Sequence, residues 1–216
     1  MITLNLASFA GRTLRVLCLG AHSDDIEIGC GGTILKLRGQ YPDCSIDWVV
    51  FSAIGVREAE ARRGAELFAG PEKGKLLLKN FRDGYMPYEG AGIKDLFEAM
   101  KDDSPPDLIF THNSTDAHQD HRLIAELTWN TFRNHLILEY EIPKYDGDMG
   151  RPNVYVPLET EIYQAKLGFV QETFRSQSSK RWFEESTFLS LMRLRGMECN
   201  APSGYAEAFY CRKLIL

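Results

Sequence analysis

The sequence has no excess of basic residues, no paired cysteine motif and no long apolar run. Its 25 Lys and Arg against 30 Asp and Glu give a net charge of −5, which lacks the basic footprint of a nucleic-acid-binding protein. The five cysteines are odd in number and form no Cys-x-x-Cys motif, which argues against a disulfide framework and a four-cysteine zinc site. No apolar run approaches the ~18 residues of a membrane span. The first residues lack the features of a signal peptide, which predicts a cytoplasmic protein.

At 216 residues with 44% hydrophobic side chains, the chain has the length and composition of one globular domain over residues 1–216. Short apolar runs alternate with helical segments along most of it. This alternation predicts an α/β fold, Rossmann-like, in which a mostly parallel sheet carries helices on both faces. The predicted strands are 13–20, 46–51, 76–78, 107–111 and 136–140, and the predicted helices are 31–38, 58–68, 93–100 and 123–132.

Four of the five histidines lie in two short acidic clusters, each directly after an apolar run. The first cluster is Ala21-His22-Ser23-Asp24-Asp25, and the second runs from His112 to His121. Because ligands bind at the carboxyl ends of strands in open α/β sheets, the two clusters can converge on one ion. Imidazole and carboxylate together suit a divalent metal such as Zn²⁺. Taken singly, each cluster has an ordinary alternative, a helix N-cap for the first and surface histidines for the second.

The residues of both clusters resemble the motifs of the PIG-L/LmbE-like deacetylases. The first cluster, followed by Gly31-Gly32-Thr33, is similar to the first motif of that family, and His118-Gln119-Asp120-His121 resembles its His-x-Asp-His motif. One departure is Ser23, which stands where the family usually has a proline that would stiffen the loop. Softer resemblances follow in the family's order at Arg57-x-x-Glu60, Asp83-Gly84, Ser176-Gln177 and Ala206-Glu207-Ala208-Phe209.

This resemblance implies an LmbE-like fold and a metal-dependent N-deacetylase. Asp24 would be the general base, His118 would stabilise the oxyanion, and Asp120 would orient His118. The alternatives are Asp24 as a helix N-cap, His118 as a hydrogen-bond donor behind the ligands, and Asp120 as a surface acid. The implied ligands of Zn²⁺, or of another divalent ion such as Fe²⁺, are His22, Asp25 and His121.

The resemblance also implies a substrate, an N-acetylated amino sugar that is free or part of a glycoconjugate. Arg57 and Asp83 are candidate substrate contacts, although an ion pair with Glu60 is the alternative for Arg57. The pattern of strands and helices breaks from 142 to 157. Within this segment 143–153 is rich in turn formers, and loops of this length are often binding loops. Its candidate substrate contacts are Tyr145, Asp146, Asp148, Arg151 and Asn153; a plain surface connection is the alternative.

The predicted reaction is hydrolysis of the N-acetyl group with release of acetate. Two other functions stay open, an amidase acting on a non-sugar or thiol conjugate and a catalytically silent carbohydrate-binding protein. The expected partner is the small-molecule substrate, and assembly into a homo-oligomer is compatible with the sequence. The glycines at 29, 31 and 32 do not form a Gly-x-Gly-x-x-Gly motif and follow acidic residues, so we expect no dinucleotide site.

Overall fold

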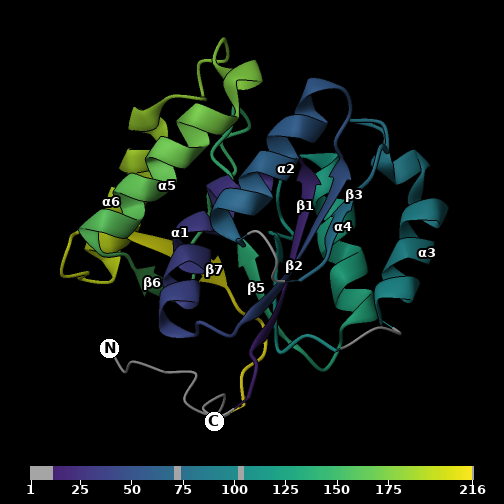
Figure 1. Cartoon of the computed structure of the whole chain (residues 1–216), viewed down its shortest axis with the longest axis horizontal. Helices are drawn as coiled ribbons and strands as arrows, with labels where there is room; N and C mark the ends of the chain where they lie inside the picture. The colour runs from purple at the N-terminus through teal and green to yellow at the C-terminus, as the bar shows by residue number, and fades with distance from the viewer. Residues whose placement is uncertain (1–11, 71–73, 102–104, 216) are drawn as a thin grey trace.

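The computed structural model describes residues 12–70, 74–101 and 105–215. Within these ranges seven strands form one sheet in the order β3-β2-β1-β4-β5-β7-β6. The first five of these run parallel, and β7 is antiparallel to both of its neighbours, so the predicted α/β fold with a mostly parallel sheet is confirmed (Figure 1). The strands are β1 (Arg15–His22), β2 (Ser45–Ser52), β3 (Leu76–Leu78), β4 (Leu108–His112), β5 (Leu136–Tyr140), β6 (Val154–Pro157) and β7 (Ala206–Tyr210).

Helices cover both faces of this sheet, and each face has its own apolar core (Figure 1). Successive side chains of a strand point to opposite faces. Along β1, Val16 and Cys18 therefore join the core beneath α1, α2, α5 and α6, while Leu17 and Leu19 join the core beneath α3 and α4. The helices are α1 (Asp25–Gln40), α2 (Val56–Phe68), α3 (Gly90–Lys101), α4 (Gln119–Thr131), α5 (Thr160–Thr173) and α6 (Glu185–Glu198).

The chain order of the strands reverses between β1 and β4. From β1 the chain proceeds outward through β2 and β3, and it then returns to place β4 on the other side of β1. Such a switch point opens a crevice at the carboxyl ends of the two strands, where ligands bind in α/β sheets. His22 ends β1 and His112 ends β4, so both histidine clusters begin at this crevice.

Two predicted boundaries were wrong. Helix α1 begins at Asp25, six residues before the predicted start, so its glycines lie inside the helix. Glycine disfavours a helix interior, and here close packing overrides that propensity. Strand β6 lies inside the segment expected to be irregular, because four residues show no readable periodicity and pairing with β7 decides their conformation. Among the described residues, no helix is both long enough and apolar enough to cross a bilayer.

Candidate metal centre

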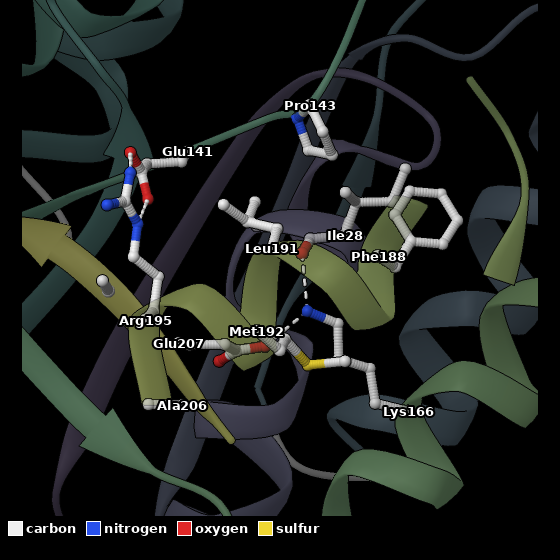
Figure 2. A pocket seen from close by; sticks show the side chains of 12 residues that line it. Ile28, Glu141, Pro143, Lys166, Phe188, Leu191, Met192, Arg195, Ala206 and Glu207 are labelled. Atoms are coloured by element: carbon white, nitrogen blue, oxygen red, sulfur yellow. Dashed lines mark hydrogen bonds and ion pairs between the residues drawn. The ribbon is translucent and has the colours of Figure 1, made fainter. Parts of the chain in front are cut away.

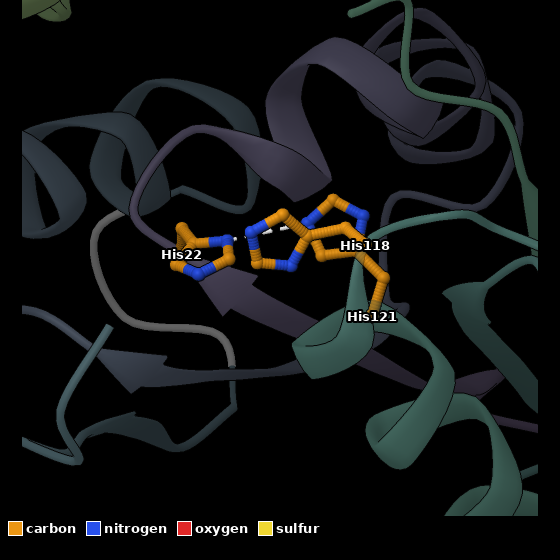
Figure 3. A group of neighbouring side chains, drawn as sticks. All are labelled: His22, His118 and His121. Atoms are coloured by element: carbon orange, nitrogen blue, oxygen red, sulfur yellow. Dashed lines mark hydrogen bonds between the residues drawn. The ribbon is translucent and has the colours of Figure 1, made fainter. Parts of the chain in front are cut away.

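The three predicted metal ligands converge at the switch point. His22 stands at the end of β1, Asp25 is the first residue of α1, and His121 lies in the first turn of α4. The Nδ1 atom of His22 is 3.2 Å from Nε2 of His121 and 3.3 Å from Oδ2 of Asp25. Nε2 of His121 is 3.5 Å from Oδ1 of Asp25. Figure 3 shows His22 and His121 side by side with His118, although the two segments are about a hundred residues apart.

The 3.2 Å between the two histidine nitrogens fits a small tetrahedral ion, and Asp25 approaches each histidine with a different oxygen. Bonds of about 2.0–2.1 Å from a tetrahedral Zn²⁺ to its ligands leave roughly 3.3–3.4 Å between neighbouring ligand atoms. The second ring nitrogen of each histidine faces a carboxylate, as is usual for histidines that bind a metal. Nε2 of His22 lies 3.1 Å from Asp83 and 3.3 Å from Asp120, and Nδ1 of His121 lies 2.9 Å from Asp116. The donor set and its surroundings therefore fit a divalent metal.

The protonation states favour the same conclusion. Burial and the nearby His112 lower the pKa of His121 to about 4, so its ring is neutral at pH 7 and keeps a free lone pair. Burial alone would raise the pKa of Asp25, but the neighbouring histidines hold it well below its usual range. Burial would lower the pKa of His22, yet the charge of Asp25 and hydrogen bonds to carboxylates raise it well above the ordinary value. The carboxylates around His22 that raise its pKa would equally favour a cation at this point.

The structure adds two residues that the sequence analysis left out of the site, Asp116 and Lys144, and it places Asp148, a predicted substrate contact, beside them. Asp116 is buried and holds His121, and Lys144 lies 2.9 Å from the same Asp116 oxygen. Asp148 accepts a hydrogen bond from the backbone amide of Ala117 and pairs with Lys144, so two loop residues are fastened to the cluster. Asp116 stands two residues before His118 and was visible in the acidic cluster. Nothing in the sequence indicated that Lys144 belongs to the site, because its contact with Asp116 joins residues 28 positions apart.

His112 contacts two of the predicted metal ligands, His121 and Asp25. Its ring stacks on that of His121 with 3.9 Å between centroids, and its Nε2 lies 3.2 Å from Asp25. The hydroxyl of Tyr140 approaches the same nitrogen at 3.2 Å and donates to the carbonyl of Leu19. His112 is fully buried. These contacts place His112 beside the predicted ligands His121 and Asp25.

Asp24 is joined to an arginine network on α2. It occupies the N-cap position of α1, but its side chain makes no capping hydrogen bond. Instead its Oδ1 accepts a 2.7 Å hydrogen bond from Arg57, and Arg57 also pairs with Glu60 at 3.1 Å. Glu60 in turn accepts hydrogen bonds from the amide and hydroxyl of Ser176. Burial raises the pKa of Asp24, while Arg57 opposes that rise by stabilising the carboxylate. The predicted Arg57–Glu60 ion pair is therefore present, as one part of a longer network.

His118 and Asp120 lie beside the ligands, with a geometry that differs from the expected one. The carboxylate of Asp120 is fully buried and accepts hydrogen bonds from the amides of Gly84 and Met86. It faces His22, whereas His118 is contacted by the Asp120 backbone amide, which donates to Nδ1 at 3.3 Å. In its neutral form His118 then carries its proton on Nε2. Burial and the charge of His22 lower the pKa of His118.

The predicted substrate contacts fall into two groups. Asp83 lies at the mouth of the site, with its side chain 74% exposed and one oxygen on His22. Arg57 is engaged by Asp24 and Glu60. Four of the candidates on the loop between β5 and β6 are exposed, Tyr145, Asp146, Arg151 and Asn153, whereas Asp148 pairs with Lys144. That loop reaches the cluster through Lys144 and Asp148, the two residues described above.

Comparisons with known proteins agree with this site. The family model described as PIG-L, GlcNAc-PI de-N-acetylase, matches residues 17–132, the stretch that carries both histidine clusters. A relative from Escherichia coli strain K12, the uncharacterized deacetylase YaiS, is 26% identical over 181 residues, which cover 77% of this chain and 94% of that protein.

Two solved structures share the fold. N,N'-diacetylchitobiose deacetylase from Pyrococcus horikoshii superposes with a TM-score of 0.72 at 22% identity, covering 95% of this chain and 86% of that one. GalB, the 4-carboxy-2-hydroxymuconate hydratase from Pseudomonas putida KT2440, also reaches 0.72 at 16% identity, over 94% of this chain and 98% of that one. The same architecture therefore carries a deacetylase and a hydratase, so the side chains at the switch point must decide the reaction.

Proposed function

The chain belongs to the PIG-L (GlcNAc-PI de-N-acetylase) family, as its motifs indicated, and from this premise we propose that it removes the N-acetyl group of an amino sugar or glycoconjugate. The observation that carries the proposal is the convergence of His22, Asp25 and His121, with ligand atoms 3.2–3.5 Å apart and a carboxylate behind each ring. We propose Zn²⁺, or another divalent ion such as Fe²⁺, as the cofactor that these residues hold.

A divalent ion in this position would act as a Lewis acid toward an amide carbonyl and would lower the pKa of water. Asp24 is the side chain that we assign as the general base. Because Arg57 occupies Oδ1 of Asp24, we assign the proton taken from the attacking water to Oδ2. The same carboxyl group then delivers that proton to the nitrogen of the leaving amine.

His118 is assigned to the developing oxyanion. Its Nδ1 accepts from the Asp120 amide, so Nε2–H is the free donor even when the ring is neutral. Asp120 holds His22 and, through Gly84 and Met86, the loop that carries Asp83. Asp120 therefore contributes by positioning this edge of the site, and its backbone selects the tautomer of His118.

The substrate meets the exposed rim of the site. Asp83 is the candidate closest to the ligands and can accept hydrogen bonds from sugar hydroxyls. Tyr145, Asp146 and Arg151 lie on the loop that Lys144 and Asp148 hold against the cluster, and we keep them as contacts of the more distant part of the substrate. For Arg57 we propose a second role, the support of Asp24, because its guanidinium is already bound there.

A screen for released acetate tests this proposal. The purified chain, loaded with Zn²⁺ or Fe²⁺, is incubated with N-acetyl amino sugars, their nucleotide conjugates and a thiol-containing amide. Release of acetate from sugars is the expected result. Release only from the non-sugar amide would favour the amidase alternative. Sugar binding without any release by the metal-loaded chain would favour a silent carbohydrate-binding protein.

Substitution of Arg57 should move the acid limb of the rate profile. Asp24 acts as a base only when ionised, so the rate falls as the pH drops through the pKa of Asp24. Arg57 lowers that pKa, and its removal in Arg57→Gln should shift the acid limb to higher pH. The measurement is kcat/KM for acetate release against pH. Arg62→Gln, which breaks an exposed pair with Glu58, is the control; an equal shift there would remove the assignment.

Asp116→Asn should weaken metal binding. Asp116 accepts from Nδ1 of His121, and loss of such a partner typically lowers metal affinity about 10–100-fold. The affinity for Zn²⁺ is measured by competition with a chromophoric chelator. Asp43→Asn removes an exposed acid and should leave the affinity unchanged. Wild-type affinity in a folded Asp116→Asn protein would show that this carboxylate does not support the site.

A further inference from the structure

Helix α1 is intrinsically weak in the turn that follows the metal ligand. Gly29, Gly31 and Gly32 fall within four residues, and glycine is less favourable than alanine inside a helix. Close packing requires them. A Cβ on Gly29 would lie 2.2 Å from the ring of Tyr140, and one on Gly31 would lie 2.5 Å from Phe68.

A buried ion pair spans this same turn. Lys166 on α5 and Glu207 on β7 are both nearly inaccessible, with 2.6 Å between Nζ and Oε1. Lys166 donates to the carbonyl of Ile28 at 2.6 Å, while Glu207 accepts from the amides of Gly32 at 2.8 Å and Thr33 at 2.6 Å. In a regular helix the Gly32 amide pairs with the Ile28 carbonyl. The ion pair thus binds both backbone groups of one helical turn. Figure 2 shows the contacts of Lys166 with Ile28 and Glu207.

Gly32 makes this arrangement sterically feasible. A Cβ at that position would come within 2.6 Å of Leu158 and 3.0 Å of the Glu207 carboxylate. The glycine motif and the Ala206–Phe209 motif, which the sequence presents separately, therefore meet in one contact. Asp24 and Asp25 stand at the start of this helix, one turn before Ile28.

We propose that Lys166 and Glu207 are positioning residues that hold the first turns of α1, and with them Asp25, in the geometry that binds the metal. The inference rests on the metal site proposed above. A buried ion pair adds little net stability compared with a neutral pair of similar shape. Replacing both charged residues by neutral ones should therefore weaken metal binding while changing the free energy of unfolding little.

The second buried pair of the same cavity offers a matched control. Arg195 and Glu141 are as buried as Lys166 and Glu207, with a 2.7 Å contact, and both pairs line the space drawn in Figure 2. Within the described part of the chain, the hydrogen bonds of Arg195 reach Glu141, Glu198 and the carbonyl of Gly150, and none reaches α1.

The experiment compares Lys166→Met/Glu207→Gln with Arg195→Met/Glu141→Gln. Both variants remove two charges and keep the approximate side-chain shape. Zn²⁺ affinity is measured by chelator competition, and unfolding of the metal-free proteins by urea. We expect about 10–100-fold weaker Zn²⁺ binding in the first variant, the range for groups that orient metal ligands, and a change below twofold in the second. Equal losses in both variants, or wild-type affinity in the first, would overturn the proposal.

Amide hydrogen exchange of the metal-free proteins supplies a readout that does not depend on the metal. Amides of residues 26–33 should exchange faster in Lys166→Met/Glu207→Gln than in the control, and unchanged exchange there would also overturn the proposal. If the double variant does not fold, Glu207→Asp, which keeps the charge pair but shortens the reach of the carboxylate toward the amides of Gly32 and Thr33, should show the same changes to a smaller extent. A wild-type chain that binds no Zn²⁺ or Fe²⁺ would contradict the proposed function, and exchange would still decide the role of the ion pair.

Discussion

Asp24→Asn is expected to lower kcat by about 10²–10⁴, the usual contribution of a general base, while the protein keeps its metal. Asparagine has nearly the same shape as aspartate, and its amide oxygen can still accept the hydrogen bond from Arg57. It cannot take a proton from water at neutral pH. The loss should therefore lie in kcat, with metal content and folding preserved.

The measurement combines acetate release with metal analysis of the same sample. Glu58→Gln is the matched control, because Glu58 also pairs with an arginine of α2 but lies exposed, away from the cluster. It should keep wild-type kcat. Near-normal turnover in metal-loaded Asp24→Asn would assign the base to another group and leave Asp24 as the residue at the start of α1.

His22→Ala and His121→Ala should each lose bound metal. Both histidines direct one nitrogen to the shared point, and each removal leaves two of three protein ligands. The fall in affinity should exceed the roughly 10–100-fold effect of groups that only orient ligands. Metal content after dialysis, and Zn²⁺ affinity by chelator competition, measure it.

His135→Ala provides the control for loss of a histidine as such. His135 packs edge-on against Phe132, with 5.4 Å between ring centroids, and lies outside both clusters. This variant should bind metal like the wild type. Full metal retention in His22→Ala would remove His22 from the ligand set and favour the group Asp25, His112 and His121. Full retention in His121→Ala would favour the group His22, Asp83, His118 and Asp120.

Membership of a deacetylase family and the architecture of the sheet leave the substrate open. A hydratase has the same fold, so the architecture alone does not determine which reaction is catalysed. In this chain the distinguishing features are chemical: the Asp24 carboxyl group hydrogen-bonded by Arg57, and two histidines whose second nitrogens meet carboxylates. The variants test these features separately. Asp24→Asn tests the general base, Asp116→Asn tests the carboxylate that holds His121, and the histidine variants test the metal ligands.

The sequence alone was enough to predict that the two histidine clusters meet at one edge of the sheet. The ligand types in the two clusters and their position after strands identified the switch-point edge, because in parallel sheets the ends of neighbouring strands meet there. Strand β5 was predicted at residues 136–140, as found, since a short buried run bounded by polar residues is readable locally. The family's motif order along the chain added the expected ligands.

Tertiary structure decided how these residues are held. The carboxylate of Asp120 faces His22 and binds amides 34–36 residues away, and Lys144 reaches Asp116 across 28 residues. The glycine turn of α1 is held by Lys166 and Glu207, more than 130 residues downstream. Such contacts leave no local periodicity, because hydrogen bonds and charge pairs depend on where the folded chain places each atom. Helix propensity predicted that the helix starts at the glycines. In the structure they lie inside the helix, because they pack against Tyr140 and Phe68.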